Sequence, residues 1–238
     1  MACNPSFPGA NQLLRDAGGR ALSFLRLQPW FGQLAAARQE EVAASVFTLS
    51  GAKGEVLLHA GEEVKGWYAV LEGLVKLQSQ SADGRRQGFL GIPGGEWFGE
   101  GSVMKKSPRL YEAIALRDSE LLCLPRAQFE ELAATNLPFS RALNEQLNMR
   151  FGQAMGIIEA MRLRTPEQRV AAYLVPPLWN GPRRMVLSQE ELGILAGLSR
   201  QTVNAMLKEL ERRGLVSLQF ARVDIVDEVA LARFARGA

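Results

Sequence analysis

Apolar and polar positions divide the chain into three stretches of different pattern. Residues 22–47 carry apolar side chains at helical spacing, interrupted at Pro29, which predicts short leading helices. Residues 52–125 alternate short apolar runs with glycine-rich turns, a pattern that is typical of β-strands. From Arg126 onward the helical spacing returns. The pattern therefore predicts a β-rich unit between helical segments.

The middle stretch predicts an antiparallel barrel or jelly roll. No helix-length segment separates its strand-length runs, which disfavours a parallel sheet. Asp83-Gly84, between two of these runs, is a good hairpin turn. The strand candidates are residues 55–59, 67–71, 74–78, 88–92 and 120–124.

A long helix is predicted between Pro138 and Pro166. Its apolar positions recur at steps of three and four residues, which keeps them on one seam. We expect this seam to pair with its copy in a homodimer; packing on the chain's own barrel is the alternative. A further helix is expected over residues 164–179, before a loop rich in Pro and Gly. The seam residues are Leu143, Leu147, Phe151, Ala154, Ile158 and Met161.

Residues 187–208 meet the demands of two helices joined by a tight turn. Ser188 and Glu191 are spaced as a capping box for the first helix. Gly193 leaves room for the crossing helix, and Gly197 sits where the turn needs a positive φ. The apolar residues expected to fill the wedge between the helices are Leu192, Ala196, Leu198, Val203 and Met206.

The second of these helices carries polar residues on its outward side, starting at its N-terminus, where a recognition helix meets base edges. Arginine makes bidentate contacts with guanine, and Gln or Asn with adenine, whereas the capping serine and a nearby threonine suit phosphate. A hairpin over residues 215–220 and 222–226 would add a wing. A helix pair that does not bind DNA is the alternative. The candidate DNA contacts are Ser188, Gln189, Ser199, Arg200, Gln201, Thr202, Asn204 and Lys208.

Composition adds limits to this picture. The net charge of +3 lies entirely in residues 164–238, which hold 11 Lys and Arg against 8 Asp and Glu, and this permits DNA binding. Cys3 and Cys123 form neither a disulfide framework nor a metal cluster, and the single His59 disfavours an all-protein zinc site. No secretory signal or long apolar run is present, so we expect a cytoplasmic chain without membrane association.

The chain resembles the cyclic AMP receptor protein / fumarate-nitrate regulator (CRP/FNR) family of bacterial transcription factors along nearly its whole length. The resemblance rests on motifs in a fixed order and spacing, with Arg109 nine residues after the glycine- and glutamate-rich motif at 95–100. The motifs are Gly61-Glu62, Leu71-Glu-Gly73, Gly95-Glu-Trp-Phe-Gly-Glu100, Ser188-Gln-Glu-Glu-Leu192, Gly197-Leu-Ser-Arg-Gln-Thr-Val203, Leu207-Lys-Glu-Leu-Glu211 and Gly214-Leu-Val216.

This resemblance implies an α+β chain in three parts. A β-roll sensor of the cyclic-nucleotide-binding type, with its leading helices, would span residues 1–137. A dimerisation helix would span residues 138–165, and a winged helix-turn-helix residues 166–238. The implied function is that of a homodimeric regulator, more often an activator that touches RNA polymerase than a repressor, bound to a two-fold symmetric promoter site. Gln201 and Ala205 stand where well-known members carry Glu and Arg, so their operator sequence does not transfer.

The implied effector site departs further from the family pattern. In nucleotide-binding members the turn at Gly99-Glu100 would meet the ribose, and Arg109 the cyclic phosphate. Leu110 and Tyr111 follow that arginine where a small hydroxyl residue is expected. Ala154 and Met155 occupy the helix positions expected to offer hydroxyls to adenine. Cyclic AMP is therefore disfavoured, and we expect Glu100 and Arg109 to pair with each other instead.

The composition bears on other sensor chemistries of the family. An iron–sulfur cluster needs four thiolates, and the chain has two cysteines. Neither His59 nor Cys123 stands at the spacing of the haem ligands in carbon-monoxide-sensing members, although haem in another ligation is left open. Thiol oxidation at Cys123 is disfavoured because an apolar strand raises the thiol pKa.

Two functions of other classes compete with a DNA-binding regulator. One is a cyclic-nucleotide-type module with an output other than DNA, which the helix-turn-helix disfavours. The other is an enzyme, but no Ser/His/Asp or Cys/His set forms around one histidine and no phosphate loop is present. We therefore expect no catalytic residues.

Overall fold

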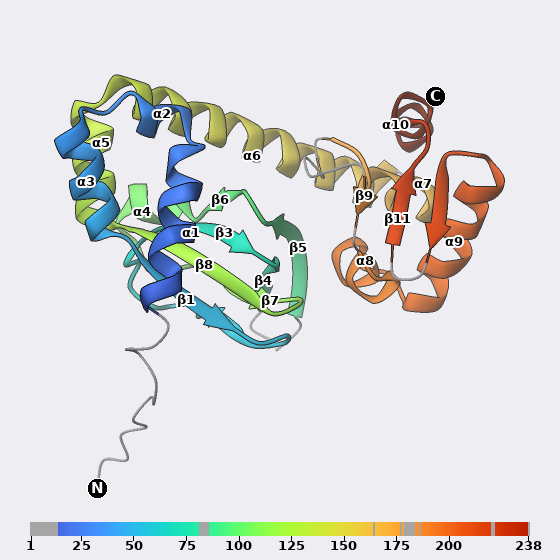
Figure 1. Ribbon diagram of the computed structural model, residues 1–238. Coiled ribbons are helices and arrows are strands. Elements are labelled where there is room, and N and C mark those ends of the chain that lie inside the picture. Colours follow the sequence, from blue (N-terminus) through green and yellow to red (C-terminus); the bar gives the residue numbers. More distant parts are fainter. Residues whose placement is uncertain are drawn as a thin grey trace, which may run out of the picture.

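The computed structural model describes residues 14–80, 86–163, 165–176, 178, 184–185, 187–219 and 222–237 (Figure 1). It confirms the predicted α+β class, with a β-roll at the N-terminal side, one long helix, and a smaller C-terminal domain. In Figure 1 the long helix leaves the roll and carries the C-terminal domain at its far end. The predicted turn at Asp83-Gly84 lies outside the described residues.

In the part of the chain described before the roll there are three short helices, which confirms the predicted helical type, although the first begins before the predicted residue 22. They are α1 (Leu14–Arg26), α2 (Pro29–Gly32) and α3 (Ala36–Ser45). Proline stands at the start of α2, where its missing N–H costs no helical hydrogen bond. Phe47 was expected at the end of the helical segment, but it begins the first strand and pairs with Cys123 far along the chain. Local spacing does not reveal such a distant partner.

The roll consists of two four-stranded antiparallel sheets. Its strands are β1 (Phe47–Gly51), β2 (Val56–Leu58), β3 (Gly66–Glu72), β4 (Leu74–Gln80), β5 (Arg86–Pro93), β6 (Trp97–Phe98), β7 (Glu112–Ala115) and β8 (Ser119–Pro125). The strand orders are β1-β8-β3-β6 and β2-β7-β4-β5. All five predicted strands are present and every pairing in the roll is antiparallel. The sequence missed β1, β6, β7 and a short helix, α4 (Glu100–Lys105).

Two further helices leave the roll, α5 (Arg126–Thr135) and α6 (Leu137–Leu163). An aromatic cluster fixes α6 to the roll. Trp67 of β3 stacks on Trp97 of β6 with ring centroids 4.2 Å apart. Phe139 of α6 meets Trp67 edge-on at 5.7 Å and Trp30 of α2 at 4.9 Å. These large buried rings join the leading helices, the sheet and α6 in one core.

The C-terminal domain is a winged helix. Its elements are α7 (Pro166–Ala172), β9 (Arg184–Met185), α8 (Gln189–Ala196), α9 (Arg200–Arg212), β10 (Val216–Gln219), β11 (Arg222–Ile225) and α10 (Glu228–Arg236). The predicted hairpin is confirmed, because β10 and β11 pair antiparallel and β9 adds a third strand. The helix expected over 164–179 is wrong in length, since α7 ends at Ala172. Residues 173–175 are buried in turns, and apolar spacing alone does not distinguish a buried turn from a helix.

Within the described residues, no helix is both long and apolar enough to cross a membrane.

Candidate DNA-binding surface and sensor cavity

The first helix of the helix-turn-helix begins with the predicted capping box. Ser188 N donates to Glu191 Oε2 at 2.7 Å, and Glu191 N donates to Ser188 Oγ at 3.1 Å. Gly197 ends α8 at φ 65°, a conformation that glycine adopts without strain. A Cβ on Gly193 would lie 2.7 Å from the carbonyl oxygen of Leu198, so only glycine allows this crossing. The predicted helix–turn–helix geometry is confirmed.

The second helix, α9, starts at a serine cap. Ser199 Oγ accepts from Thr202 N at 3.1 Å and lies 2.8 Å from Thr202 Oγ1. Val203, Leu207 and Leu210 form its buried face. The predicted wedge is also present, with Leu192, Ala196 and Val203 buried and Leu198 and Met206 partly buried.

The opposite face of α9 is polar and open. Arg200, Gln201 and Lys208 are exposed, and Asn204 is half-buried. In Figure 1, α9 lies on the side of its domain that faces away from the roll. Gln189 Nε2 of α8 donates to Asn204 Oδ1 at 3.3 Å, so the first helix orients a side chain of the second.

The wing stands beside this face. A hollow of about 350 Å³ opens between α8, α9 and the wing, and Gln189, Glu190 and Arg200 line it with Gln219 and Arg222 of the wing. Arg222 Nη2 lies 2.8 Å from Asp224 Oδ2, a pair that keeps the arginine at the edge of the hollow. The structure thus brings three of the predicted contacts, Ser188, Gln189 and Arg200, around one hollow beside the wing.

A second site lies between the roll and α6. A cavity of about 280 Å³, called here the sensor cavity, is lined by two predicted effector residues at the start of α4, Gly99 and Glu100, and by a third from α6. Ala154 lines it from α6. Gly99, the residue before α4, has φ 91°, a left-handed conformation that glycine adopts without strain. The remaining lining residues are Leu77, Leu90, Phe98, Gly101, Ser102, Lys105, Ser107, Leu110, Tyr111, Arg150 and Ile157.

Glu100 is held by partners that the sequence did not predict. Its Oε2 accepts from Trp67 Nε1 at 3.4 Å, and its Oε1 lies 3.9 Å from Arg150 Nε. Arg150 Nη1 also lies 3.0 Å from Glu96 Oε2. Burial raises the pKa of Glu100 and of Glu96, and the charge of Arg150 opposes both shifts.

Arg109 lies apart from this cluster. It is 3% exposed, and its guanidinium carbon sits 5.2 Å from the centre of the Tyr68 ring. Its Nη1 atom is buried and has no hydrogen-bond partner among the residues that the structure describes. The expected Glu100–Arg109 pair is wrong: within the described residues no ion pair joins them, because Arg150 takes the place beside Glu100 and the Tyr68 ring takes the guanidinium.

The predicted seam divides between two environments. Leu143 is buried and Leu147 partly buried in the roll's own aromatic core, which corrects their assignment to an intermolecular seam. Ala154 is exposed on α6, and the large apolar seam residues Phe151, Ile158 and Met161 are about half to two-thirds exposed. Met155 does not line the sensor cavity; it lines a groove of about 860 Å³ with Ile158 between α6, α7 and α10.

Arg150 is the main site residue that sequence reasoning missed. Its signal was a basic residue on the face of α6 that also carries the buried Phe139, Leu143 and Gln153. Only the fold shows that Glu96 and Glu100 come to this point.

The described residues include no group of three His, Cys, Asp or Glu placed to bind a metal ion. Cys123 is fully buried in β8, and this burial raises the pKa of its thiol to about 12. The predicted inert character of this cysteine is therefore supported.

Comparisons with known proteins agree with this architecture. Residues 48–136 match the cyclic nucleotide-binding domain family, and residues 168–234 match the Crp-like helix-turn-helix domain family. The chain is 32% identical over 197 residues to the transcriptional regulator LdrP of Thermus thermophilus, covering 79% of this chain and 96% of LdrP. It is 29% identical over 204 residues to the HTH-type transcriptional regulator Cmr of Mycobacterium tuberculosis, covering 84% of this chain and 82% of Cmr.

A solved structure confirms the fold over most of its length. The structure of FixK2 from Bradyrhizobium japonicum superposes with a TM-score of 0.67 at 22% identity, covering 79% of this chain and 96% of FixK2. The β-roll, the long helix and the winged helix thus recur together in one chain. The protein belongs to the CRP/FNR family of DNA-binding transcription regulators.

Proposed function

We propose that this regulator binds a two-fold symmetric DNA site as a homodimer, with α9 in the major groove of each half-site. The exposed polar face of α9 carries the proposal, since it begins at the helix N-terminus with Arg200 and Gln201. Arg200 is the proposed guanine reader, and Asn204 lies one turn further along. Ser188, Ser199 and Thr202 are proposed phosphate contacts, and Lys208 adds positive charge.

The proposed partner for α6 is a second copy of the chain. Phe151 is 67% exposed, Met155 51%, Ile158 49% and Met161 52%, and all four lie on this one helix. Water-exposed apolar side chains in such a row favour association. A parallel copy of α6 would cover them and set the two α9 helices apart by a fixed distance, as a palindromic operator requires.

The sensor cavity is the proposed site of an effector of small size. Its volume of about 280 Å³ and its lining by Leu77, Leu90, Phe98 and Ile157 favour a compact, partly apolar molecule. Cyclic AMP is not the proposed ligand, because Glu100 is already occupied by Trp67 and Arg150. Haem is the alternative sensor group that the sequence leaves open. An iron–sulfur cluster is not proposed, because it needs four thiolates and the chain has two cysteines.

The output is proposed to be transcriptional activation through contact with RNA polymerase in the cytoplasm, by analogy with the family. No catalytic role is proposed.

Selection of bound fragments from random double-stranded DNA tests this function. We expect enrichment of an inverted repeat whose half-sites are centred about one helical turn apart, or a multiple of it. Failure of any sequence to enrich above the starting pool would contradict the proposal. Enrichment of a single, non-repeated site would retain DNA binding but contradict the symmetric dimer.

A further inference from the structure

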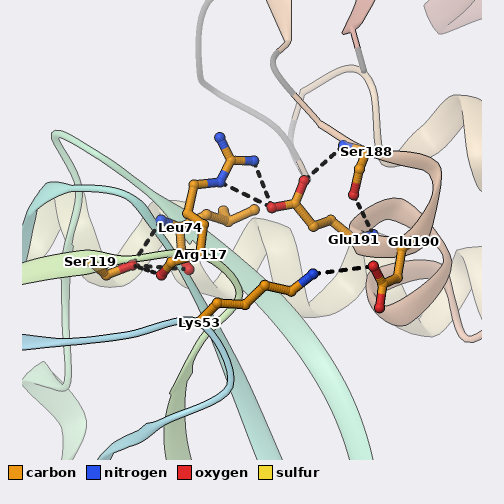
Figure 2. Close-up of polar contacts among 7 residues, drawn as sticks. All are labelled: Lys53, Leu74, Arg117, Ser119, Ser188, Glu190 and Glu191. Atoms are coloured by element: carbon orange, nitrogen blue, oxygen red, sulfur yellow. Dashed lines mark hydrogen bonds and ion pairs between the residues drawn. The ribbon is translucent and has the colours of Figure 1, made fainter. Parts of the chain in front are cut away.

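The roll and the DNA-binding domain contact each other through the first helix of the helix-turn-helix (Figure 2). Arg117, in the turn between β7 and β8, places Nη2 2.8 Å and Nε 3.0 Å from Glu191 Oε1. Lys53 Nζ lies 3.2 Å from Glu190 Oε2. Figure 2 shows both basic side chains reaching from the roll toward the first turn of α8.

The two ion pairs differ in burial. The side chains of Arg117 and Glu191 are 33% and 8% exposed, whereas those of Lys53 and Glu190 are 60% and 57% exposed. Solvent and salt screen a buried pair much less than an exposed one. The Arg117–Glu191 bridge is therefore the stronger link between the domains.

The same carboxylate performs two tasks. While Glu191 Oε1 meets Arg117, Glu191 Oε2 accepts from Ser188 N at 2.7 Å and closes the capping box of α8. On the other side, the carbonyl oxygen of Arg117 accepts from Ser119 Oγ at 2.7 Å, and Ser119 Oγ accepts from Leu74 N at 3.2 Å. The bridge thus connects the start of β4 with the N-terminus of α8.

Close packing accompanies the bridge. A Cβ on Gly91 of β5 would lie 2.9 Å from Leu195 Cδ1 of α8, and one on Gly88 would lie 3.6 Å from the carbonyl oxygen of Ile194. Leu74 of the roll is buried in the same cluster as Leu195. Because these contacts interlock, α8 sits on the roll in one defined orientation.

The location of the bridge gives it an electrostatic consequence. Glu190 lines the hollow that Gln189 and Arg200 also line, beside the proposed DNA contacts. Carboxylates at this place would repel DNA phosphates if they had no positive partner. In the docked arrangement each carboxylate faces a cation from the roll, and the face of α9 stays open.

We propose that Arg117, assisted by Lys53, is a clamp that holds the DNA-binding domain on the roll in its DNA-competent orientation and neutralises the acidic first turn of α8. The clamp rests on the DNA-binding function proposed above. The docked arrangement also connects the sensor cavity with the DNA-binding domain. Leu90 of β5 lines the cavity, and its neighbour Gly91 packs on α8, so a ligand in the cavity could change how α8 is held.

Operator affinity of full-length variants tests the clamp. Arg117→Gln should weaken binding to the selected operator by about fivefold or more, the lower end of typical coupling between sites. Glu191→Gln keeps the capping box, since Gln serves it as well as Glu, and removes the repelling charge. The double variant Arg117→Gln/Glu191→Gln should therefore bind the operator more tightly than Arg117→Gln alone.

Arg126→Gln is the matched control, because it also removes one positive charge, at the start of α5, and within the described residues the ion pairs of Arg126 are with Glu63 and Glu130. Equal operator affinities for Arg117→Gln and Arg126→Gln would overturn the clamp, as would a double variant no better than Arg117→Gln.

Hydrogen–deuterium exchange separates the clamp from the DNA-binding proposal. In Arg117→Gln the amides of α8 and β5 should exchange faster than in Arg126→Gln, without DNA present. Equal exchange of these amides in the two variants would show that Arg117 does not hold α8 on the roll. A wild-type protein that binds no DNA would refute the proposed function, while this exchange measurement would still decide whether Arg117 fixes α8.

Discussion

Gln189 and Asn204, on the two helices of the helix-turn-helix, form a hydrogen bond in which Gln189 Nε2 donates to Asn204 Oδ1 at 3.3 Å. Adenine offers a donor and an acceptor to an Asn side chain, whereas guanine offers two acceptors in the major groove. An Asn204 whose carbonyl oxygen is engaged presents its amide donors to the base. The pair therefore favours guanine, which offers acceptors at N7 and O6, over adenine, whose N6 donor would find the carbonyl oxygen of Asn204 already engaged.

Gln189→Ala should consequently relax the base preference at the position that Asn204 reads. The expected loss of discrimination is about 0.5–1.5 kcal/mol, the net contribution of one hydrogen bond. Binding to a panel of operators that differ only at that base pair measures it. Asn204→Ala should remove the same preference, and a Gln189→Ala profile identical to wild type would show that Gln189 does not position Asn204.

Ile158→Asp should convert a dimer into monomers. Ile158 is 49% exposed on α6 among other apolar side chains, and a carboxylate buried against a second copy would lose its hydration without gaining a partner. Sedimentation equilibrium at micromolar protein measures the shift, with a weakening of association of at least about 2 kcal/mol. Glu145→Lys, exposed on the same helix, is the control. If Ile158→Asp stays dimeric, the interface lies elsewhere.

The buried carboxylates of Glu96 and Glu100, beside Arg150, should make the stability of the folded protein depend on pH. Burial raises the folded-state pKa of Glu100 and Glu96 above the usual value of 4.5. A raised pKa means that the folded state holds its protons more tightly, so the stabilisation is complete below about pH 4.5 and is lost as pH rises through the folded pKa. Between these limits the two groups make the folded state less stable at higher pH.

Glu100→Gln should remove part of this dependence. The free energy of unfolding in urea, measured from pH 4.5 to pH 7.5, should fall less steeply with rising pH than in the wild type. Glu63→Gln is the control, because that side chain is 87% exposed. A Glu100→Gln curve parallel to the wild-type curve would mean that Glu100 titrates normally in the folded protein.

Sequence patterns predicted the elements that carry a local signal. The helix-turn-helix could be read residue by residue because its capping box, its positive-φ glycine and its apolar wedge all lie within one short segment. The five strand candidates were likewise visible as apolar runs between glycines. The short strands β6 and β7 were not, because few residues carry their pattern and distant partners stabilise them.

The sensor site shows where sequence reasoning fails. The pairing of Glu100 with Arg109 was expected because the family resemblance puts both in one effector site that lacks other nucleotide contacts, but the fold places Arg150 beside Glu100 and Arg109 over the Tyr68 ring. The prediction that all six seam residues lie in a dimer interface was wrong in part for a similar reason. Helical spacing groups Leu143 with Ile158, yet only the first of them faces the roll. Which neighbour covers a helix face is a tertiary property that periodicity does not encode.

The affinity of Arg200→Ala for the selected operator in a gel-shift titration tests whether α9 is the recognition helix. Arg200 is exposed at the start of α9, so its replacement should leave the fold intact and remove one base contact. We predict a loss of about 1–3 kcal/mol, or about five- to 150-fold in affinity, with little change on non-specific DNA. Arg233→Ala, exposed on α10 of the same domain, should bind as the wild type does. Undiminished operator binding by Arg200→Ala would contradict the assignment of α9 as the recognition helix in this register.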